Sequence, residues 1–219
     1  MSGSIVVVCG PPGVGKTTVA ERVQQRTGGR LFRTDAVRKS IFPEPTYSPE
    51  ETDAVYRALL DRVERTIADG RAIADGHSQQ VLDEVAPPTV ESDVTTPVES
   101  DALPTVETPP NALVAILDGT FRSSDRRDAV RDLGASLDVS VTFLRVTCSD
   151  SVVRSRIESR EGLSDADYEI YRQIKSEFEP IEADHAVIDN SDGRADTYRC
   201  VDAALDASSV SNAFDLTLE

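Results

Sequence analysis

A glycine-rich segment near the N-terminus carries the residue types that bind a nucleoside triphosphate. Gly10 and Gly15 are separated by four residues, and Lys16 and Thr17 follow directly. Glycines let the backbone curl so that successive N–H groups point at phosphate oxygens. A lysine at this spacing reaches the β- and γ-phosphates, and a threonine hydroxyl there binds Mg²⁺. This is the Walker A pattern, so ATP and Mg²⁺ are the expected ligands, and Lys16 is also expected to act in catalysis. The predicted nucleotide-binding residues are Gly10, Pro11, Pro12, Gly13, Val14, Gly15, Lys16, Thr17 and Thr18.

An aspartate follows the apolar segment 113–117, which has the composition of a buried strand. Ligands of open parallel sheets bind at the carboxyl ends of the strands, so this residue, Asp118, is expected to lie at the phosphate site. We predict that Asp118 binds Mg²⁺ together with Thr17. The alternative is that Asp118 and Gly119 form only a turn.

A second aspartate, Asp35, follows the short apolar segment 30–33. A carboxylate there would lie across from the γ-phosphate, where it could accept the proton of an attacking hydroxyl or orient that hydroxyl. Arg38, one helical turn later, could hold an anionic group of the acceptor. The alternative makes Asp35 the N-cap of a helix over 36–41, which is chemically sensible as well.

Arginines on a later predicted helix could stabilise charge on the transferring phosphoryl group. Arg156 and Arg160 are four residues apart and share a helix face, as expected for an arginine-bearing lid. The alternative is a solvated face whose arginines pair with Glu158 and Glu161. Three more arginines follow Asp118 and are weaker candidates for contacts with the acceptor: Arg122, Arg126 and Arg127. Surface ion pairing is the favoured interpretation for them, and Arg122 is the one predicted to bind the acceptor.

These residues stand in segments that resemble small P-loop kinases of the zeta-toxin, gluconate-kinase and polynucleotide-kinase kind. The closest resemblance is to a broad family described as AAA-type ATP-binding proteins or predicted kinases, and it covers nearly the whole chain. The resemblance implies that Asp35 acts as the base, that Arg38 binds the acceptor and that Arg156 and Arg160 belong to a lid. It is carried by the segments 33–39, 47–50, 117–121, 156–160 and 171–180.

Strands and helices are predicted to alternate, which indicates an α/β fold with a parallel sheet and helices on both faces. We expect the P-loop NTPase fold with five strands. Ser48 is expected to cap a long helix, with Pro49 at its first position and Glu51 at its third. The predicted strands are 5–9, 30–33, 113–117, 139–146 and 186–188. A first helix is predicted after the glycine-rich segment 10–18, through about residue 27, and further helices are predicted over 48–75, 124–137, 150–160, 164–179 and 195–207.

One domain is expected over 1–208, with an insertion inside it and a flexible tail over 209–219. The insertion, 83–110, has seven acidic residues, no basic ones and half of the prolines of the chain. Such a composition buries too little apolar surface to offset its ordering entropy, so we expect it to be disordered. A solvated spacer is the favoured interpretation, and a segment that binds an unknown protein is the alternative.

The net charge of −16 argues mildly against nucleic acid as a partner, because a protein that follows phosphates needs a basic stripe. Lysine occurs at three positions only, and this composition resembles proteins of salt-loving organisms. No apolar run is long enough for a membrane helix, and no signal peptide is recognised, so a cytoplasmic location is expected. Three distant cysteines, Cys9, Cys148 and Cys200, fit a reducing compartment.

The leading hypothesis is an ATP-dependent kinase that transfers the γ-phosphoryl group to a hydroxyl of a small metabolite. One alternative keeps this chemistry and uses the 5′-hydroxyl of a polynucleotide. The other is a nucleotide-dependent regulatory ATPase that signals through the acidic insertion.

Overall fold

The computed structural model describes residues 3–74, 111–159 and 165–208. The predicted insertion 83–110, the predicted tail 209–219 and Arg160 lie outside these residues. Strands and helices alternate as expected, with most boundaries within two residues of the predicted ones. The elements are β1 (Ser4–Cys9), α1 (Lys16–Thr27), β2 (Gly29–Arg33), α2 (Thr34–Ile41), α3 (Pro49–Ala74), β3 (Asn111–Asp118), α4 (Ser124–Ser136), β4 (Ser140–Thr147), α5 (Asp150–Glu158), α6 (Asp165–Ser176), β5 (His185–Asp189) and α7 (Arg194–Ala207).

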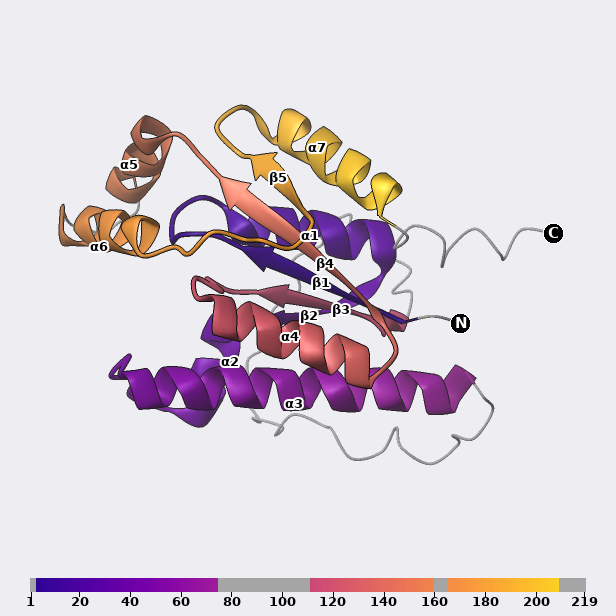
Figure 1. Ribbon diagram of the computed structural model, residues 1–219. Coiled ribbons are helices and arrows are strands. Elements are labelled where there is room, and N and C mark those ends of the chain that lie inside the picture. Colours follow the sequence, from indigo (N-terminus) through magenta and orange to yellow (C-terminus); the bar gives the residue numbers. More distant parts are fainter. Residues whose placement is uncertain (1–2, 75–110, 160–164, 209–219) are drawn as a thin grey trace, which may run out of the picture.

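The strands form one parallel sheet in the order β2-β3-β1-β4-β5, with β1 at its centre (Figure 1). All six residues of β1 are buried. A continuous β-branched run suits this position, because a strand with helices on both sides has no face left for polar side chains. The predicted α/β fold with a five-stranded parallel sheet is confirmed.

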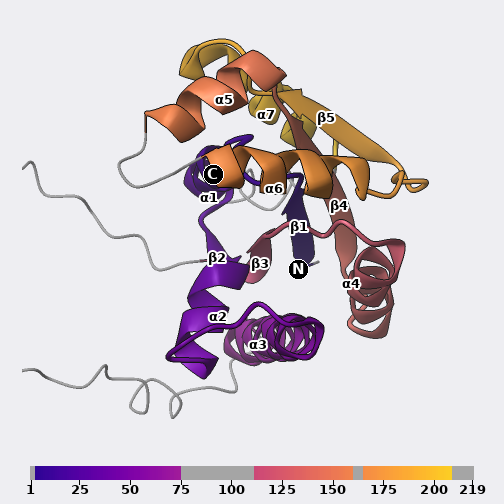
Figure 2. The same cartoon turned by 90° about the vertical axis from the view of Figure 1, so that its left-hand side faces the viewer.

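Alternate residues of β1 face two separate apolar cores. Ile5, Val7 and Cys9 pack with side chains of α2, α3 and α4 on one face. Val6 and Val8 pack with α1, α5, α6 and α7 on the other. The strands end on the left of Figure 1, and Figure 2 looks onto that edge, with α6 lying across it between α5 and the pair α2 and α3.

The long helix α3 begins as predicted. The backbone N–H of Glu51 donates to Ser48 Oγ at 3.2 Å, so Ser48 caps the helix and Pro49 occupies its first position. The Glu51 carboxylate in turn accepts the backbone N–H of Thr46 and of Tyr47, the latter at 2.7 Å. None of the helices in the described part of the chain is long and apolar enough to span a membrane.

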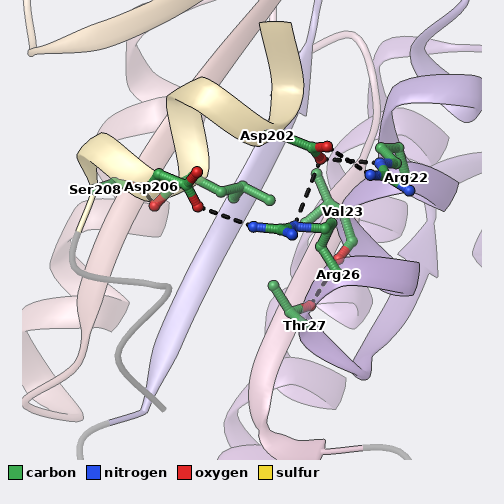
Figure 3. Close-up of polar contacts among 8 residues, drawn as sticks. Arg22, Val23, Arg26, Thr27, Asp202, Asp206 and Ser208 are labelled. Atoms are coloured by element: carbon green, nitrogen blue, oxygen red, sulfur yellow. Dashed lines mark hydrogen bonds and ion pairs between the residues drawn. The ribbon is translucent and has the colours of Figure 1, made fainter. Parts of the chain in front are cut away.

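Ion pairs join the first helix to the last one (Figure 3). Arg22 donates two hydrogen bonds to Asp202, at 2.9 and 2.5 Å, and Arg26 pairs with Asp206 at 2.9 Å. The helix α1 follows the glycine-rich loop directly. These ion pairs therefore connect the helix behind that loop to α7.

Candidate active site

The glycine-rich loop has a backbone that only glycine adopts without strain. Gly10, Gly13 and Gly15 have φ angles of 146°, 79° and 90°. A Cβ atom on Gly15 would lie 2.0 Å from Nδ2 of Asn190, and one on Gly10 would lie 2.5 Å from the carbonyl oxygen of Val146. The loop passes directly into α1, whose first backbone N–H groups and dipole face it. The loop therefore has the curled backbone that the glycine spacing predicts, and phosphate binding by it stays a prediction.

Lys16 lies half-buried at the start of α1, and its Nζ donates to the carbonyl oxygen of Pro11 at 2.8 Å. Burial lowers the pKa of Lys16, while the charges of Asp118 and Asp35 act to raise it. A phosphate oxygen arriving in the loop would offer the ammonium a stronger, charge-assisted acceptor than this carbonyl.

Asp118 ends β3 and is 5% exposed. Its Oδ2 accepts the hydroxyl hydrogen of Thr17 at 3.0 Å. Arg33 contacts the same pair, with Nη2 3.1 Å from Thr17 Oγ1 and Nε 3.4 Å from Asp118 Oδ2. Burial raises the pKa of Asp118, and the nearby Lys16, Thr17 and Arg33 oppose this rise. The carboxylate thus faces Thr17 and Lys16 of the glycine-rich segment, and binding of Mg²⁺ by Asp118 stays a prediction.

Thr17 and Asp118 supply a hydroxyl and a carboxylate oxygen, which are hard ligands of the kind that Mg²⁺ prefers. If Mg²⁺ binds with ATP, these two residues would hold it, and the ion would neutralise charge on the phosphates. The described residues contain no group of three or more His, Cys, Asp or Glu that could hold a metal ion. In nucleotide sites Mg²⁺ takes most of its remaining ligands from phosphates and water.

Asp35 is an exposed residue in the first turn of α2, one position after the helix begins at Thr34. Arg33 occupies the N-cap position, so the alternative that made Asp35 an N-cap is wrong. The helix starts earlier than predicted, and the Thr34 hydroxyl donates to the backbone oxygen of Asp118 at 3.3 Å. Asp35 has no hydrogen-bond or ion-pair partner among the described residues, yet its charge acts on both Lys16 and Asp118. It is a free carboxylate close to the phosphate loop.

Arg38 is buried between α2 and α3. It donates to Glu51 at 3.3 Å and to Thr52 at 3.2 Å, and the ring of Tyr47 lies 4.7 Å from its guanidinium carbon. These contacts fix the guanidinium on the side of the sheet where Asp35 lies. Binding of an acceptor by Arg38 stays a prediction.

The arginines after Asp118 differ in burial. Arg122 is exposed and pairs with Glu177 at 2.7 Å, and Arg126 pairs with Asp53 at 2.9 Å. Arg127 is buried, and the prediction of surface pairing is wrong for this residue. It donates to backbone carbonyl groups of two segments, that of Phe121 at 2.8 Å and that of Pro180 at 2.7 Å among them. Arg127 therefore joins the loop after β3 to the segment after α6.

Arg156 lies against the phosphate loop. Its Nη1 donates to the carbonyl oxygen of Val14 at 3.3 Å, and its Nη2 to that of Asn190 at 2.9 Å. The solvated-face alternative fails for this residue, because Glu158 pairs with Arg154 at 2.8 Å instead. The structure thus places Arg156 beside the loop backbone, and a role in stabilising transferred charge stays a prediction.

Asn190 and Thr197 were not expected at the site. Asn190 follows β5, is 4% exposed, and donates from Nδ2 to the Val14 oxygen at 2.8 Å. Its Oδ1 accepts the hydroxyl hydrogen of the fully buried Thr197 at 2.7 Å. Asn190 could have been identified from its position directly after a strand. The same position led to the selection of Asp35 and Asp118.

Comparison with known proteins agrees with this geometry. Residues 5–75 match a family model described as an AAA domain. A sugar kinase from a Janibacter species is similar, with a TM-score of 0.59, 17% sequence identity and coverage of 96% of this chain and 98% of that chain. A gluconokinase from Sinorhizobium meliloti has a TM-score of 0.58 at 17% identity, covering 94% and 93%. An APS kinase from Mycobacterium tuberculosis, in complex with AMPPNP and APS, has a TM-score of 0.57 at 13% identity, covering 94% and 98%.

The chain has the fold of small P-loop kinases. A search of curated proteins found no match. Sequence identities of 13 to 17% show likeness of fold alone. The role of each residue in this chain therefore has to be argued from the distances and contacts described above.

Proposed function

We propose that this P-loop protein is a kinase that transfers the γ-phosphoryl group of ATP to a hydroxyl of a small metabolite. The observation that carries the proposal is the pairing of Thr17 with Asp118 at 3.0 Å beside a glycine-rich loop, with the unpaired carboxylate of Asp35 nearby. The three similar structures are all described as kinases, which supports phosphoryl transfer over a purely regulatory use of the nucleotide.

In this proposal the amides of the loop and Lys16 hold the β- and γ-phosphates, and the fixed loop costs little to organise on binding. Asp35 orients the acceptor hydroxyl and takes its proton as the oxygen attacks phosphorus. Because Asp35 is exposed, it is available to a solvent-borne acceptor before any helix moves. Arg156 keeps the Val14 carbonyl in place and thereby supports the loop.

Labelled ATP tests the proposal. The protein is incubated with [γ-³²P]ATP and Mg²⁺, with pools of hydroxylated metabolites in one arm and 5′-hydroxyl oligonucleotides in the other. Label on a metabolite supports the proposal. Label on oligonucleotide ends would identify a polynucleotide kinase instead, and release of phosphate alone would indicate a regulatory ATPase.

Two variants separate catalysis from nucleotide binding. Asp35→Asn is expected to lower phosphoryl transfer by at least ~10²-fold, the range of general base catalysis, with the Kd for ATP changed little. Lys16→Ala is expected to weaken ATP binding itself. Calorimetry gives the Kd and single-turnover transfer gives the rate. An Asp35→Asn variant that loses binding and transfer to the same extent would contradict the role of base.

A further inference from the structure

Arg145 is a cation without a counterion among the residues that the structure describes. It lies near the end of β4 and is half-buried, and its Nε is shielded from solvent without a hydrogen-bond partner. No described residue accepts a hydrogen bond from it or pairs with it as a carboxylate. Arginines of this chain that lack a partner elsewhere, such as Arg57 and Arg194, are exposed and therefore hydrated.

A second guanidinium lies beside that of Arg145. Its guanidinium carbon lies 5.1 Å from the centre of the Phe178 ring, and that of Arg127 lies 5.6 Å from the same ring. The two carboxylates that flank Phe178 in sequence are engaged elsewhere, Glu177 by Arg122 and Glu179 by the backbone N–H of Ser124. Two guanidinium groups thus lie beside one aromatic ring, and no ion pair within 4.0 Å joins either of them to a carboxylate in the described part of the chain, although the charge of Arg127 acts on Glu179.

Arg145 also lies close to the phosphate loop, on the acceptor side of the sheet. It is paired in register with Cys9, the residue before Gly10, and shares with it the face covered by α2, α3 and α4. The positive charges of Arg127, Arg145 and Lys16 all act on the Cys9 thiol. Asp35 belongs to α2, on this same face. The unpaired cation therefore stands on the side from which an acceptor would meet the γ-phosphate.

A guanidinium N–H that is shielded from water without an acceptor is costly, and Nε of Arg145 is such a group, on a side chain whose outer part reaches solvent and a ligand. We propose that Arg145 binds an anionic group of the phosphoryl acceptor. The acceptor is then a hydroxyl compound that carries a carboxylate, sulfate or phosphate, and not a neutral polyol. This inference rests on the proposed kinase function and narrows its substrate class.

A binding experiment tests the anion site without knowledge of the acceptor. The protein is first loaded with Mg²⁺ and AMPPNP, so that the phosphate loop is filled. Inorganic sulfate is then titrated by calorimetry at constant ionic strength, with chloride as the exchanged ion. We expect wild-type protein to bind sulfate and Arg145→Gln to bind it about 10- to 100-fold more weakly, the loss of one charge-assisted hydrogen bond. Arg131→Gln, on the exposed face of α4, is the matched control and should behave as wild type.

A thermal scan separates a binding role from a packing role. Arg145→Gln removes a cation that nothing in the fold neutralises, so the midpoint of the ligand-free variant should equal or exceed that of wild type. A lower midpoint, with sulfate binding unchanged, would mean that Arg145 serves packing and would overturn the inference.

The rate of phosphoryl transfer to anionic and to neutral acceptors of similar size gives a third test. Transfer from ATP to gluconate and glucose 6-phosphate is compared with transfer to glucose, and the anionic compounds are expected to be preferred in wild type and to lose the preference in Arg145→Gln. Preference for glucose, or failure of loaded wild type to bind sulfate, refutes the anion site alone. Failure of AMPPNP to bind refutes the kinase proposal instead, so the two failures are distinguishable.

Discussion

The carboxylate of Asp118 is placed where ionisation costs stability. Burial raises its pKa, although Lys16, Thr17 and Arg33 stabilise the charged form. For a group whose pKa is raised by folding, the contribution to stability is present at low pH and is lost as the pH rises through the folded pKa. Burial therefore disfavours the ionised form of Asp118 in the fold, and a bound cation would stabilise that form.

Asp118→Asn mimics the protonated form, and we predict opposite effects on folding and on ligand binding. The midpoint of thermal unfolding without nucleotide should stay equal or rise at pH 7. The Mg²⁺-dependent part of ATP affinity should fall by about 10-fold or more, because a carboxylate oxygen near the ion is lost. Thermal scans and calorimetry with Mg²⁺ or with EDTA measure the two quantities.

Asp196→Asn is the matched control for this substitution, since Asp196 is an exposed carboxylate paired with Arg199 on α7. It should leave ATP affinity unchanged. If Asp118→Asn lowered the unfolding midpoint while ATP affinity with Mg²⁺ stayed at the wild-type value, Asp118 would be a structural residue only.

At the scale of elements, the loop between β5 and α7 holds the phosphate loop in place. Val14 is the residue that both Asn190 and Arg156 contact through its carbonyl oxygen. Thr197, in the first turn of α7, fixes the Asn190 amide so that its NH₂ group faces Val14. A buried amide with both ends satisfied is rigid, and loss of one partner leaves the other unpaired at a cost of about 1–3 kcal/mol.

We predict that Asn190→Asp weakens ATP binding by roughly 10-fold, because a carboxylate cannot donate to the Val14 oxygen, and one lost hydrogen bond is worth about that factor. The Thr197 hydroxyl can still donate to the new carboxylate, so the fold should remain intact by circular dichroism. Ser208→Ala, at the far end of α7, is the control. Unchanged ATP affinity in Asn190→Asp would show that the phosphate loop holds its shape without this contact.

Local patterns explain what could be predicted of the elements and the site. The β-branched run of β1, the spacing of Gly10, Gly15 and Lys16, and the cap at Ser48 are each contained within a few residues, so the sequence alone identified them. The contacts of Val14 join residues 142 and 176 positions apart, and no local pattern encodes them. Arg145 was missed because an arginine inside an apolar strand gives no sign of whether a carboxylate will meet it.

For the whole molecule, charge is distributed unevenly. The chain has 39 acidic and 23 basic residues, yet Lys16, Arg33 and Arg145 gather where the strands end. A local cluster of cations within an acidic protein can attract anions at short range while the net charge repels them at long range. Salt screens the long-range term first, because charges in partly buried sites are screened much less. Association with ATP should therefore not require low ionic strength.

The same imbalance of charge leads to a prediction about stability. A net charge of −16 destabilises the compact state through self-repulsion, and the Debye length falls from about 10 Å at 0.1 M salt to about 3 Å at 1 M. We expect the unfolding midpoint to rise as KCl increases over this range. Salt also weakens surface ion pairs such as those of Arg22 and Arg26 with α7 (Figure 3), but exposed pairs contribute about 0–1 kcal/mol each, so the repulsion should dominate.

The control variant is Asp202→Asn, which removes one of these partners and should keep the same salt dependence of the unfolding midpoint. A midpoint that falls with KCl in wild type and not in this variant would mean that the ion pairs between α1 and α7 outweigh the repulsion of the whole chain.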